Sequence, residues 1–346
     1  MAQQKLIIIA GPTASGKSES AVRIAQRLSG SIISADSMQV YRGMDIGSAK
    51  VTPEEMGGIP HYLIDIRDPK EEWNVTEFQR LAKESIAEIA SEGRLPILCG
   101  GTGFYIQSLL YDIEFTQMED NLSLRDALQQ AAEQKMTLKQ ALDSVQNLLP
   151  QKTEQMEIPE GMGPEALHSF LTLLDPAAAS EIHANNVKRV IRAIEFSLQG
   201  GGLISEHNAD QLTRPPAYDA VFFVLHMPRE QLYARIDARV DKMFQNGLVE
   251  EVKALMDRGL TSSDVSMQGL GYHQVIDALN GLTTMEEAVT QIKTQTRHFA
   301  KRQLTWFKRE EKRNPEQVIW IDRTDFQSAD EMIDTMCRLI RAKGIT

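Results

Sequence analysis

The chain has 346 residues, 42% of them hydrophobic and 25% charged, a composition that excludes a disordered, collagen-like or low-complexity protein. Two cysteines, Cys99 and Cys337, are too few for a disulfide scaffold or a zinc-finger cluster, and no run reaches the roughly 20 apolar residues of a membrane span, so we expect a cytoplasmic protein without membrane contact. The formal net charge of -11 argues against coating of nucleic acid through bulk positive charge, but it is compatible with a local basic surface.

Short apolar runs alternate with helical patterns along most of the chain. The strand-like runs are 5–10, 31–35, 61–66, 95–99, 220–225 and 318–321. The first is predicted to be a strand rather than a signal peptide, because it has no charged flank and no cleavage site. Helical patterns follow the first run and cover 76–92, 229–246, 248–258, 285–312 and the residues from about 329. This alternation predicts an α/β fold with a parallel sheet and flanking crossover helices.

A different pattern fills the segment from about 112 to about 202, where apolar residues recur at helical spacing only. We expect a helical insertion domain here, between two parts of a catalytic core formed by 1–111 and 203–346. Turn signals and a pair of prolines mark 203–216. Residues 112–180 contain twelve acidic and four basic residues, so this part of the insertion is acidic.

A phosphate-binding loop follows the first predicted strand. Its residues match G-x-x-x-x-G-K-[ST] and are Gly11, Pro12, Thr13, Ala14, Ser15, Gly16, Lys17 and Ser18. Backbone N–H groups, a helix N-terminus and the lysine charge together suit a bound phosphate, and the Ser18 hydroxyl suits Mg²⁺. The loop makes the fold P-loop NTPase-like. It leaves open whether the phosphate belongs to a kinase, an NTPase or an enzyme that binds a diphosphate ester.

Two further loops begin where predicted strands end. Asp36 follows 31–35, and GGTG at 100–103 follows 95–99. Ligands of open α/β sheets bind at this edge, so we expect both loops beside the phosphate loop. Asp36 is a candidate general base or a carboxylate that holds a metal through water, with a loop or helix-capping aspartate as the alternative. Thr102 is a candidate donor to a leaving phosphate oxygen.

The chain also carries a basic helical segment. Residues 293–313 include eight basic and two acidic residues, and Lys293, Arg297 and Lys301 recur every four residues. Such a face suits RNA phosphates, and we expect Lys301 and Arg302 to contact RNA. The alternative is a solvated surface without a ligand. Tyr272 is a candidate wall residue of a base pocket near this helix, with an ordinary core aromatic as the alternative.

Together these segments resemble the tRNA dimethylallyltransferase family. The resemblance is carried from residue 5 to about residue 309 by GPTASGKS, ISADSMQVYRGMDIGSAK, PHYLIDI, GGTGFY, IHANNVKRVIRAIEF, RIDARVDKMFQNGLVEEV, GLGYHQ and TRHFAKRQLTWFKR. It implies transfer of a dimethylallyl group from dimethylallyl diphosphate to N6 of adenine-37, next to the tRNA anticodon, with Mg²⁺ and release of pyrophosphate. No protein partner is implied.

The resemblance also implies roles for residues. Asp36 would accept the proton of the adenine amine, Thr102 would reach an oxygen near the breaking bond, and Arg235 would supply a further cation, although Arg239 shares its helical face and can exchange that role. In the family the anticodon stem-loop is contacted by two segments. They are Asp36, Ser37, Met38 and Gln39, and the helix that carries Lys188, Arg189 and Arg192.

Two other functions fit part of the pattern. One is a P-loop enzyme acting on a free nucleotide, either a kinase or an adenylate isopentenyltransferase. A kinase would need a phosphate acceptor site and usually a mobile lid with arginines, of which the acidic segment 112–180 has few, and an adenylate isopentenyltransferase would not need the basic segment at 293–313. The other is a nucleotide-regulated RNA-binding ATPase, which has no need of Asp36 and Thr102 beside the phosphate loop. The transferase uses all of these features, and we therefore predict a tRNA dimethylallyltransferase.

Overall fold

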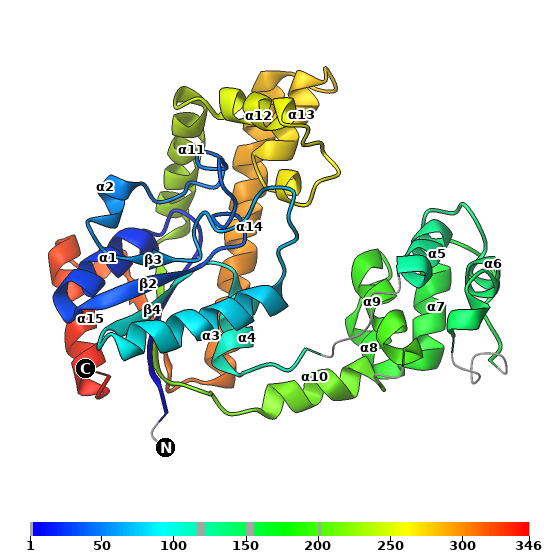
Figure 1. Cartoon of the computed structure of the whole chain (residues 1–346), viewed down its shortest axis with the longest axis horizontal. Helices are drawn as coiled ribbons and strands as arrows, with labels where there is room; N and C mark the ends of the chain where they lie inside the picture. The colour runs from blue at the N-terminus through cyan, green and yellow to red at the C-terminus, as the bar shows by residue number, and fades with distance from the viewer. Residues whose placement is uncertain (1–2, 116–121, 150–155, 200–201, 346) are drawn as a thin grey trace. The chain divides into compact units, whose positions relative to one another are not determined.

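The computed structural model describes residues 3–115, 122–149, 156–199 and 202–345 (Figure 1). The chain divides into two compact units, one formed by Met1–Asp112 with Pro216–Thr346 and the other by Ile113–Pro215. Within the described ranges, no helix combines the length and the apolar character that crossing a bilayer requires. The first unit contains a sheet, whereas the described part of the second contains helices and no strand.

A parallel sheet forms the centre of the first unit. Over the described residues its six strands follow the order β3-β2-β4-β1-β5-β6. They are β1 (Lys5–Ala10), β2 (Gly30–Ala35), β3 (His61–Tyr62), β4 (Leu95–Gly100), β5 (Asp219–His226) and β6 (Val318–Asp322), and every paired neighbour is parallel. The predicted α/β class with a parallel sheet is confirmed. The prediction of a strand over 61–66 was wrong beyond Tyr62, because Leu63 and Asp65 take left-handed backbone with φ of 63° and 54°.

Helices cover both faces of this sheet. On one face α1 (Lys17–Leu28) and α15 (Ala329–Ala342) pack together and share a core with Phe223 (Figure 1). On the other, α14 (Met285–Arg313) brings Phe307 edge to face with Phe222, the ring centroids 6.2 Å apart. Neighbouring residues of a strand point to opposite faces, so a strand covered on both sides is apolar throughout. This explains the continuous apolar runs in the sequence.

The remaining helices of the first unit complete these layers. They are α2 (Pro53–Met56), α3 (Val75–Ser91), α4 (Gly103–Leu110), α11 (Arg229–Gln245), α12 (Leu248–Asp257) and α13 (Tyr272–Leu279), with the 3₁₀ turns η3 (Ser266–Gln268) and η4 (Arg323–Asp325). Helices α3 and α4 contact each other through Phe78 and Tyr105, whose rings stack with centroids 4.4 Å apart. Helix α11 runs beside α14 (Figure 1).

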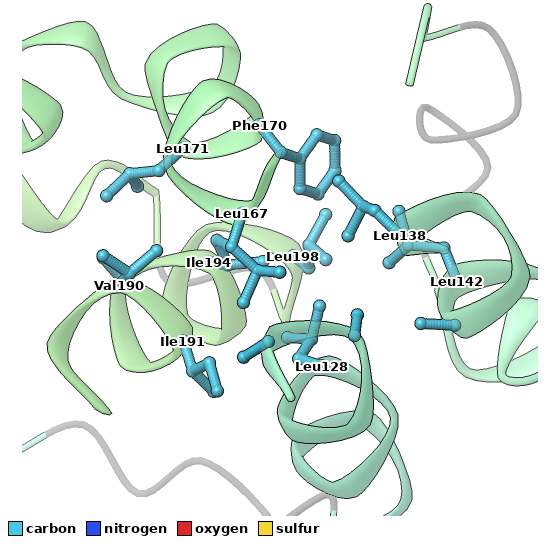
Figure 2. Close-up of a cluster of buried hydrophobic side chains, with 14 of the residues drawn as sticks. Leu128, Leu138, Leu142, Leu167, Phe170, Leu171, Val190, Ile191, Ile194 and Leu198 are labelled. Carbon is cyan, nitrogen blue, oxygen red and sulfur yellow. The ribbon is translucent and has the colours of Figure 1, made fainter. Parts of the chain in front are cut away.

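The second unit has its own hydrophobic core. Its elements are α5 (Leu122–Ala132), α6 (Leu138–Asp143), η1 (Gln146–Leu148), α7 (Pro164–Leu174), α8 (Pro176–Glu181), α9 (Val187–Leu198) and α10 (Ile204–Thr213). Figure 2 shows Leu128, Leu138, Phe170 and Ile194, from four of these helices, turned toward one another. Burial of these side chains is the main force that stabilises a small helical unit of this kind.

The segment from 203 to 216 differs from its prediction. Turns were expected, but α10 occupies most of it and belongs to the second unit. The reason is a long-range contact, because the buried Asp175 accepts hydrogen bonds from the Ser205 backbone N–H at 2.9 Å and from its hydroxyl at 2.7 Å. These bonds satisfy groups at the start of α10 that a helix leaves unpaired.

Candidate functional site

Three loops meet at the carboxyl edge of the sheet. Strands β2, β4 and β1 are neighbours, and their last residues Ala35, Gly100 and Ala10 are paired in register. The phosphate loop starts directly after β1, Asp36 directly after β2, and Thr102 two residues after β4, with its backbone N–H donating to Ala35 O at 3.3 Å. The structure thus brings together the three loops that the sequence singled out.

The phosphate loop presents hydrogen-bond donors. Helix α1 starts at Lys17, and its N-cap Gly16, at φ 87°, supplies no side-chain cap, so the first-turn N–H groups have no intrahelical acceptor. The buried hydroxyl of Ser15 has no hydrogen-bond partner within the described structure. Free donors and the positive end of a helix dipole at one place form an anion site.

Four cationic side chains surround this loop. Lys17 Nζ donates to Pro12 O at 3.4 Å, and Arg235 Nε donates to Ala14 O at 2.9 Å. Arg239 Nη1 donates to Thr13 Oγ1 at 2.9 Å, and Arg323 Nη1 donates to Ser15 O at 3.1 Å. The sequence left Arg235 and Arg239 as alternatives, and the structure brings both to the loop.

Electrostatics add to the case for an anion. Burial lowers the pKa of Arg239, and Arg235 lowers it further, while the Asp36 carboxylate opposes both effects. Burial likewise lowers the pKa of Lys17, with a further lowering by Arg239. A bound anion would favour the charged forms of both side chains, because it stabilises cations that burial has removed from water.

Gln303 ties two of the loops together, although its place in the segment TRHFAKRQLTWFKR indicates no such role. Its side chain is 7% exposed, its Oε1 accepts from Thr13 N at 2.9 Å, and its Nε2 donates to Gly101 O at 2.9 Å. A Cβ on Gly101 would lie only 2.2 Å from that Nε2, so the glycine makes the approach of α14 possible. The apolar spacing of 285–312 predicted a helix with a buried face, but it did not predict that Gln303 joins the two loops.

Asp36 is half-buried, and its Oδ1 accepts from Met38 N at 2.9 Å. This bond shapes the turn that contains Ser37, Met38 and Gln39, all half-buried. Gln39 Nε2 donates to Ala49 O at 3.3 Å, so this side chain is engaged inside the protein. The second carboxylate oxygen of Asp36, Oδ2, takes no part in that bond.

A small cavity of about 20 Å³ lies beside the loop, lined among others by Ser18, Ser34 and Gln39. These side chains offer oxygen atoms, the ligand type that Mg²⁺ prefers. No cluster of three or more His, Cys, Asp or Glu residues that could hold a metal exists in the described ranges. A metal ion here would therefore depend on Ser18 and on the oxygens of a bound phosphate. Cys99 also lines this cavity, and burial raises its thiol pKa to about 11.

Glu251 holds the segment that follows the Asp36 turn. Its Oε2 accepts from Asp45 N at 2.9 Å and Ile46 N at 2.7 Å, and its Oε1 accepts from Gly47 N at 3.0 Å and from the Tyr272 hydroxyl at 2.8 Å. Tyr272 is fully buried. The prediction of Tyr272 as a wall of a base pocket was therefore wrong, because its ring packs in the core and its hydroxyl bonds to Glu251.

A basic groove of about 510 Å³ runs along α14. It is lined by His298, Lys301, Arg302, Thr305, Trp306 and Arg309. Trp306 lies against Gly103, next to Thr102, and its ring meets the exposed ring of Phe104 with centroids 6.2 Å apart. The groove thus brings positive charge and aromatic surface close to the loop after β4.

The predicted basic face of α14 is divided in the structure. Lys293 pairs with Asp241 at 2.6 Å, and Arg297 pairs with Asp237 at 2.9 Å, both on α11. Within the described ranges no ion pair engages Lys301 or Arg302. The charges of Lys293 and Arg297 are largely neutralised by these pairs. The positive potential of α14 therefore comes mainly from the residues that line the groove.

Three other predicted RNA contacts belong to the second unit. Lys188, Arg189 and Arg192 are exposed on α9, and Arg192 Nη1 lies 3.9 Å from a carboxylate oxygen of the buried Glu195. They form a separate basic patch within that unit.

Comparisons with known proteins agree on one family. The IPP transferase family model matches residues 39–310. The tRNA dimethylallyltransferase of Lachnoclostridium phytofermentans is 45% identical over 342 residues, 99% of each chain, and that of Acetivibrio thermocellus is 43% identical over 340 residues, 98% of each chain. The crystal structure of the full-length tRNA isopentenylpyrophosphate transferase from Bacillus halodurans is 40% identical with a TM-score of 0.67, covering 99% of this chain and 97% of its own. A eukaryotic dimethylallyltransferase solved acting on tRNA is 28% identical with a TM-score of 0.77, covering 98% and 80%.

Proposed function

Because the chain belongs to the tRNA dimethylallyltransferase family, we propose that its phosphate loop, Asp36 and Thr102 form the site from which a dimethylallyl group passes to N6 of adenine-37 in tRNA. The chain is a transferase that moves a dimethylallyl group to tRNA. The observation that carries the site assignment is the register of β1, β4 and β2, which sets the three loops side by side.

The phosphate loop, in this proposal, holds the diphosphate of dimethylallyl diphosphate. The N–H groups at the start of α1 and the charges of Lys17, Arg235 and Arg239 surround the same space, which supports this assignment. Negative charge grows on the diphosphate as its C–O bond breaks. Donors and cations already in place stabilise that charge without further reorganisation. The Thr102 hydroxyl would donate to an oxygen near the breaking bond.

Asp36 is the proposed general base. The adenine amine attacks the allyl carbon, a C–N bond forms, and the electron pair of the C–O bond leaves with pyrophosphate. The proton lost from N6 passes to a carboxylate oxygen of Asp36. An exocyclic amine is a weak nucleophile, so a carboxylate positioned next to it accelerates the step.

We propose Mg²⁺ as the divalent metal of the reaction. The Ser18 hydroxyl and the diphosphate oxygens would hold it, and the position of Ser18 in the last place of G-x-x-x-x-G-K-[ST], in the first turn of α1, supports this choice. A bound metal ion supplies charge neutralisation to the leaving diphosphate.

The RNA-binding surface is proposed to include the α14 groove. Lys301 and Arg302 would bind phosphates of the anticodon stem-loop, and the segment from Asp36 to Gln39 would contact nucleotides beside the target base. Adenine-37 must leave its stack to reach Asp36, and aromatic surface such as that of Trp306 stabilises unstacked bases. Lys188, Arg189 and Arg192 are proposed as further tRNA contacts of the second unit.

Free-nucleotide chemistry is not favoured, because the relatives reported above are named for transfer to tRNA. A cytoplasmic location remains part of the proposal. It is supported by a tRNA substrate and by two free, buried cysteines.

Transfer of label tests the reaction and the role of Asp36. The purified protein is incubated with Mg²⁺, radiolabelled dimethylallyl diphosphate and unmodified tRNA, with tRNA lacking adenine-37 as a control. Asp36→Asn keeps an acceptor for the Met38 N–H but loses the base, so we expect kcat to fall about 100-fold or more with unchanged tRNA affinity. An equal loss of tRNA affinity would mean that Asp36 positions the RNA instead. Label in free AMP would instead support the free-nucleotide enzyme.

A matched pair of double variants tests the RNA surface. Lys301→Ala with Arg302→Ala should weaken tRNA binding and reduce the slope of log K against log salt by about one for each phosphate that the protein no longer neutralises. Lys293→Ala with Arg297→Ala removes the same charge from the same helix but should leave that slope unchanged, because these cations are already paired with Asp241 and Asp237. Equal effects of the two double variants on the salt slope would mean that the groove residues Lys301 and Arg302 do not contact the RNA phosphates.

A further inference from the structure

Arg323 lies outside the part of the chain that the family model matches, which ends at residue 310. It follows β6 directly, and β6 is paired with β5 up to Asp322 opposite His226, so Arg323 leaves the sheet at the edge that bears the phosphate loop. Asp322 Oδ1 accepts from the Thr324 backbone N–H at 2.9 Å and from its hydroxyl at 2.7 Å. These bonds fix the turn that carries Arg323.

The guanidinium of Arg323 is half-buried against the loop. Its Nη1 donates to Ser15 O at 3.1 Å. A Cβ on Gly16 would lie 1.7 Å from that Nη1, so the absence of a side chain at this position is what admits the guanidinium. In a trans peptide the C=O and the N–H point in opposite directions. Holding the Ser15 carbonyl therefore turns the Gly16 N–H to the other side of the peptide, away from the guanidinium.

We propose that Arg323 is a positioning residue for the diphosphate: it fixes the Ser15–Gly16 peptide so that the Gly16 N–H faces the bound anion, and it adds positive charge to the loop. Arg235 holds the preceding carbonyl, that of Ala14, in the same manner from α11. The loop is thus clamped from two elements that are far apart in the chain. This inference rests on the proposed function, in which the phosphate loop holds the diphosphate of the donor.

A purely structural role for Arg323 makes different predictions. The groups that face it include Glu19 and Arg23 of α1 as well as Arg235, so it could simply fasten the end of β6 to α1. If Arg323 only holds β6 against α1, its loss lowers the stability of the free protein. It leaves the binding of pyrophosphate to the folded protein unchanged.

The experiment compares Arg323→Gln and Arg323→Lys with Arg338→Gln. Arg338 is an exposed residue of α15 that donates to Thr335, so its variant makes the same charge change on a surface helix. For each protein we would measure the pyrophosphate dissociation constant by calorimetry with Mg²⁺, KM for dimethylallyl diphosphate, KM for tRNA, and Tm.

For Arg323→Gln we expect the pyrophosphate dissociation constant and KM for the donor to rise about tenfold, with KM for tRNA unchanged. Arg323→Lys keeps the charge but not the planar geometry, so its pyrophosphate dissociation constant should lie between those of Arg323→Gln and the unaltered protein. The dissociation constant of Arg338→Gln should match that of the unaltered protein. A lower Tm of Arg323→Gln with unchanged pyrophosphate binding would overturn the inference in favour of the fastener. Failure of the unaltered protein to bind pyrophosphate or to label tRNA would instead overturn the proposed function.

Discussion

Replacing Gln303 with methionine tests whether the phosphate loop and the loop after β4 act as one assembly. The side chain is 7% exposed and joins Thr13 N to Gly101 O by two bonds of 2.9 Å. Methionine has a similar length and volume, so Gln303→Met removes both bonds and opens no large cavity.

The expected cost follows from those two bonds. Removing one partner of a buried hydrogen bond costs about 1–3 kcal/mol, and Gln303→Met does so for two backbone groups, so the expected loss in unfolding free energy is about 2–6 kcal/mol. The catalytic effect is also large, because the loops then move independently. A displacement of about 1 Å at a reacting centre can cost about 100-fold, and we expect a fall of that order in kcat/KM for the donor.

Urea unfolding followed by tryptophan fluorescence measures the stability effect. The three tryptophans, Trp73, Trp306 and Trp320, all belong to the first unit, so the signal reports the unit that contains Gln303. Gln291→Met, at an exposed position of α14, is the matched control. A Gln303→Met protein within about 0.5 kcal/mol of the unaltered one, with the same kcat/KM, would refute the bridging role.

Three further perturbations test the site. Arg239→Ala should raise KM for the donor more than Arg235→Ala, because Arg239 is half-buried at the loop whereas Arg235 is exposed; equal changes in steady-state kinetics would contradict this. Burial raises the pKa of the Cys99 thiol to about 11 in the folded protein, whereas in the unfolded chain it is near 9.0. The folded protein therefore keeps a proton that the unfolded chain loses, and the unfolding free energy should fall as pH rises from about 9 to about 11. Urea midpoints measured across this range should fall less steeply for Cys99→Ala, and an equally steep fall would contradict this. Glu251→Gln should lower the unfolding free energy by about 2 kcal/mol or more and speed hydrogen exchange of the amides from 45 to 47, and unchanged exchange would count against the role of Glu251 as their acceptor.

The features that sequence reasoning predicted depend on neighbouring residues. The phosphate loop is a contiguous motif between a strand and a helix, and Asp36 directly follows an apolar run. Because parallel strands end at one edge, the fold class placed these loops at that edge, whereas the strand order that makes β2, β4 and β1 neighbours was not predicted. The helices predicted over 229–246, 248–258 and 285–312 agree with α11, α12 and α14, since each carries its own apolar spacing, whereas α2 and α13 were not predicted.

The features that it missed depend on distant residues. Gln303 reaches Thr13 across 290 positions, Arg323 reaches Ser15 across 308, and Glu251 reaches Asp45 across 206. Gln303 and Glu251 lie in segments that carry the family resemblance, but the local pattern does not indicate which distant groups they or Arg323 contact. Only the packing of α14, β6 and α12 against the loop edge gives each of them a role.

Charge counting has a similar limit, and it bears directly on how RNA is bound. The segment 293–313 carries eight basic and two acidic residues, yet Lys293 and Arg297 are paired with Asp241 and Asp237. A phosphate gains little from a cation that already faces a carboxylate, because the opposite charges of an ion pair largely offset each other at distances larger than their separation. The RNA affinity of α14 should therefore follow the charges of the groove, Lys301 and Arg302 among them, rather than the formal charge of the segment.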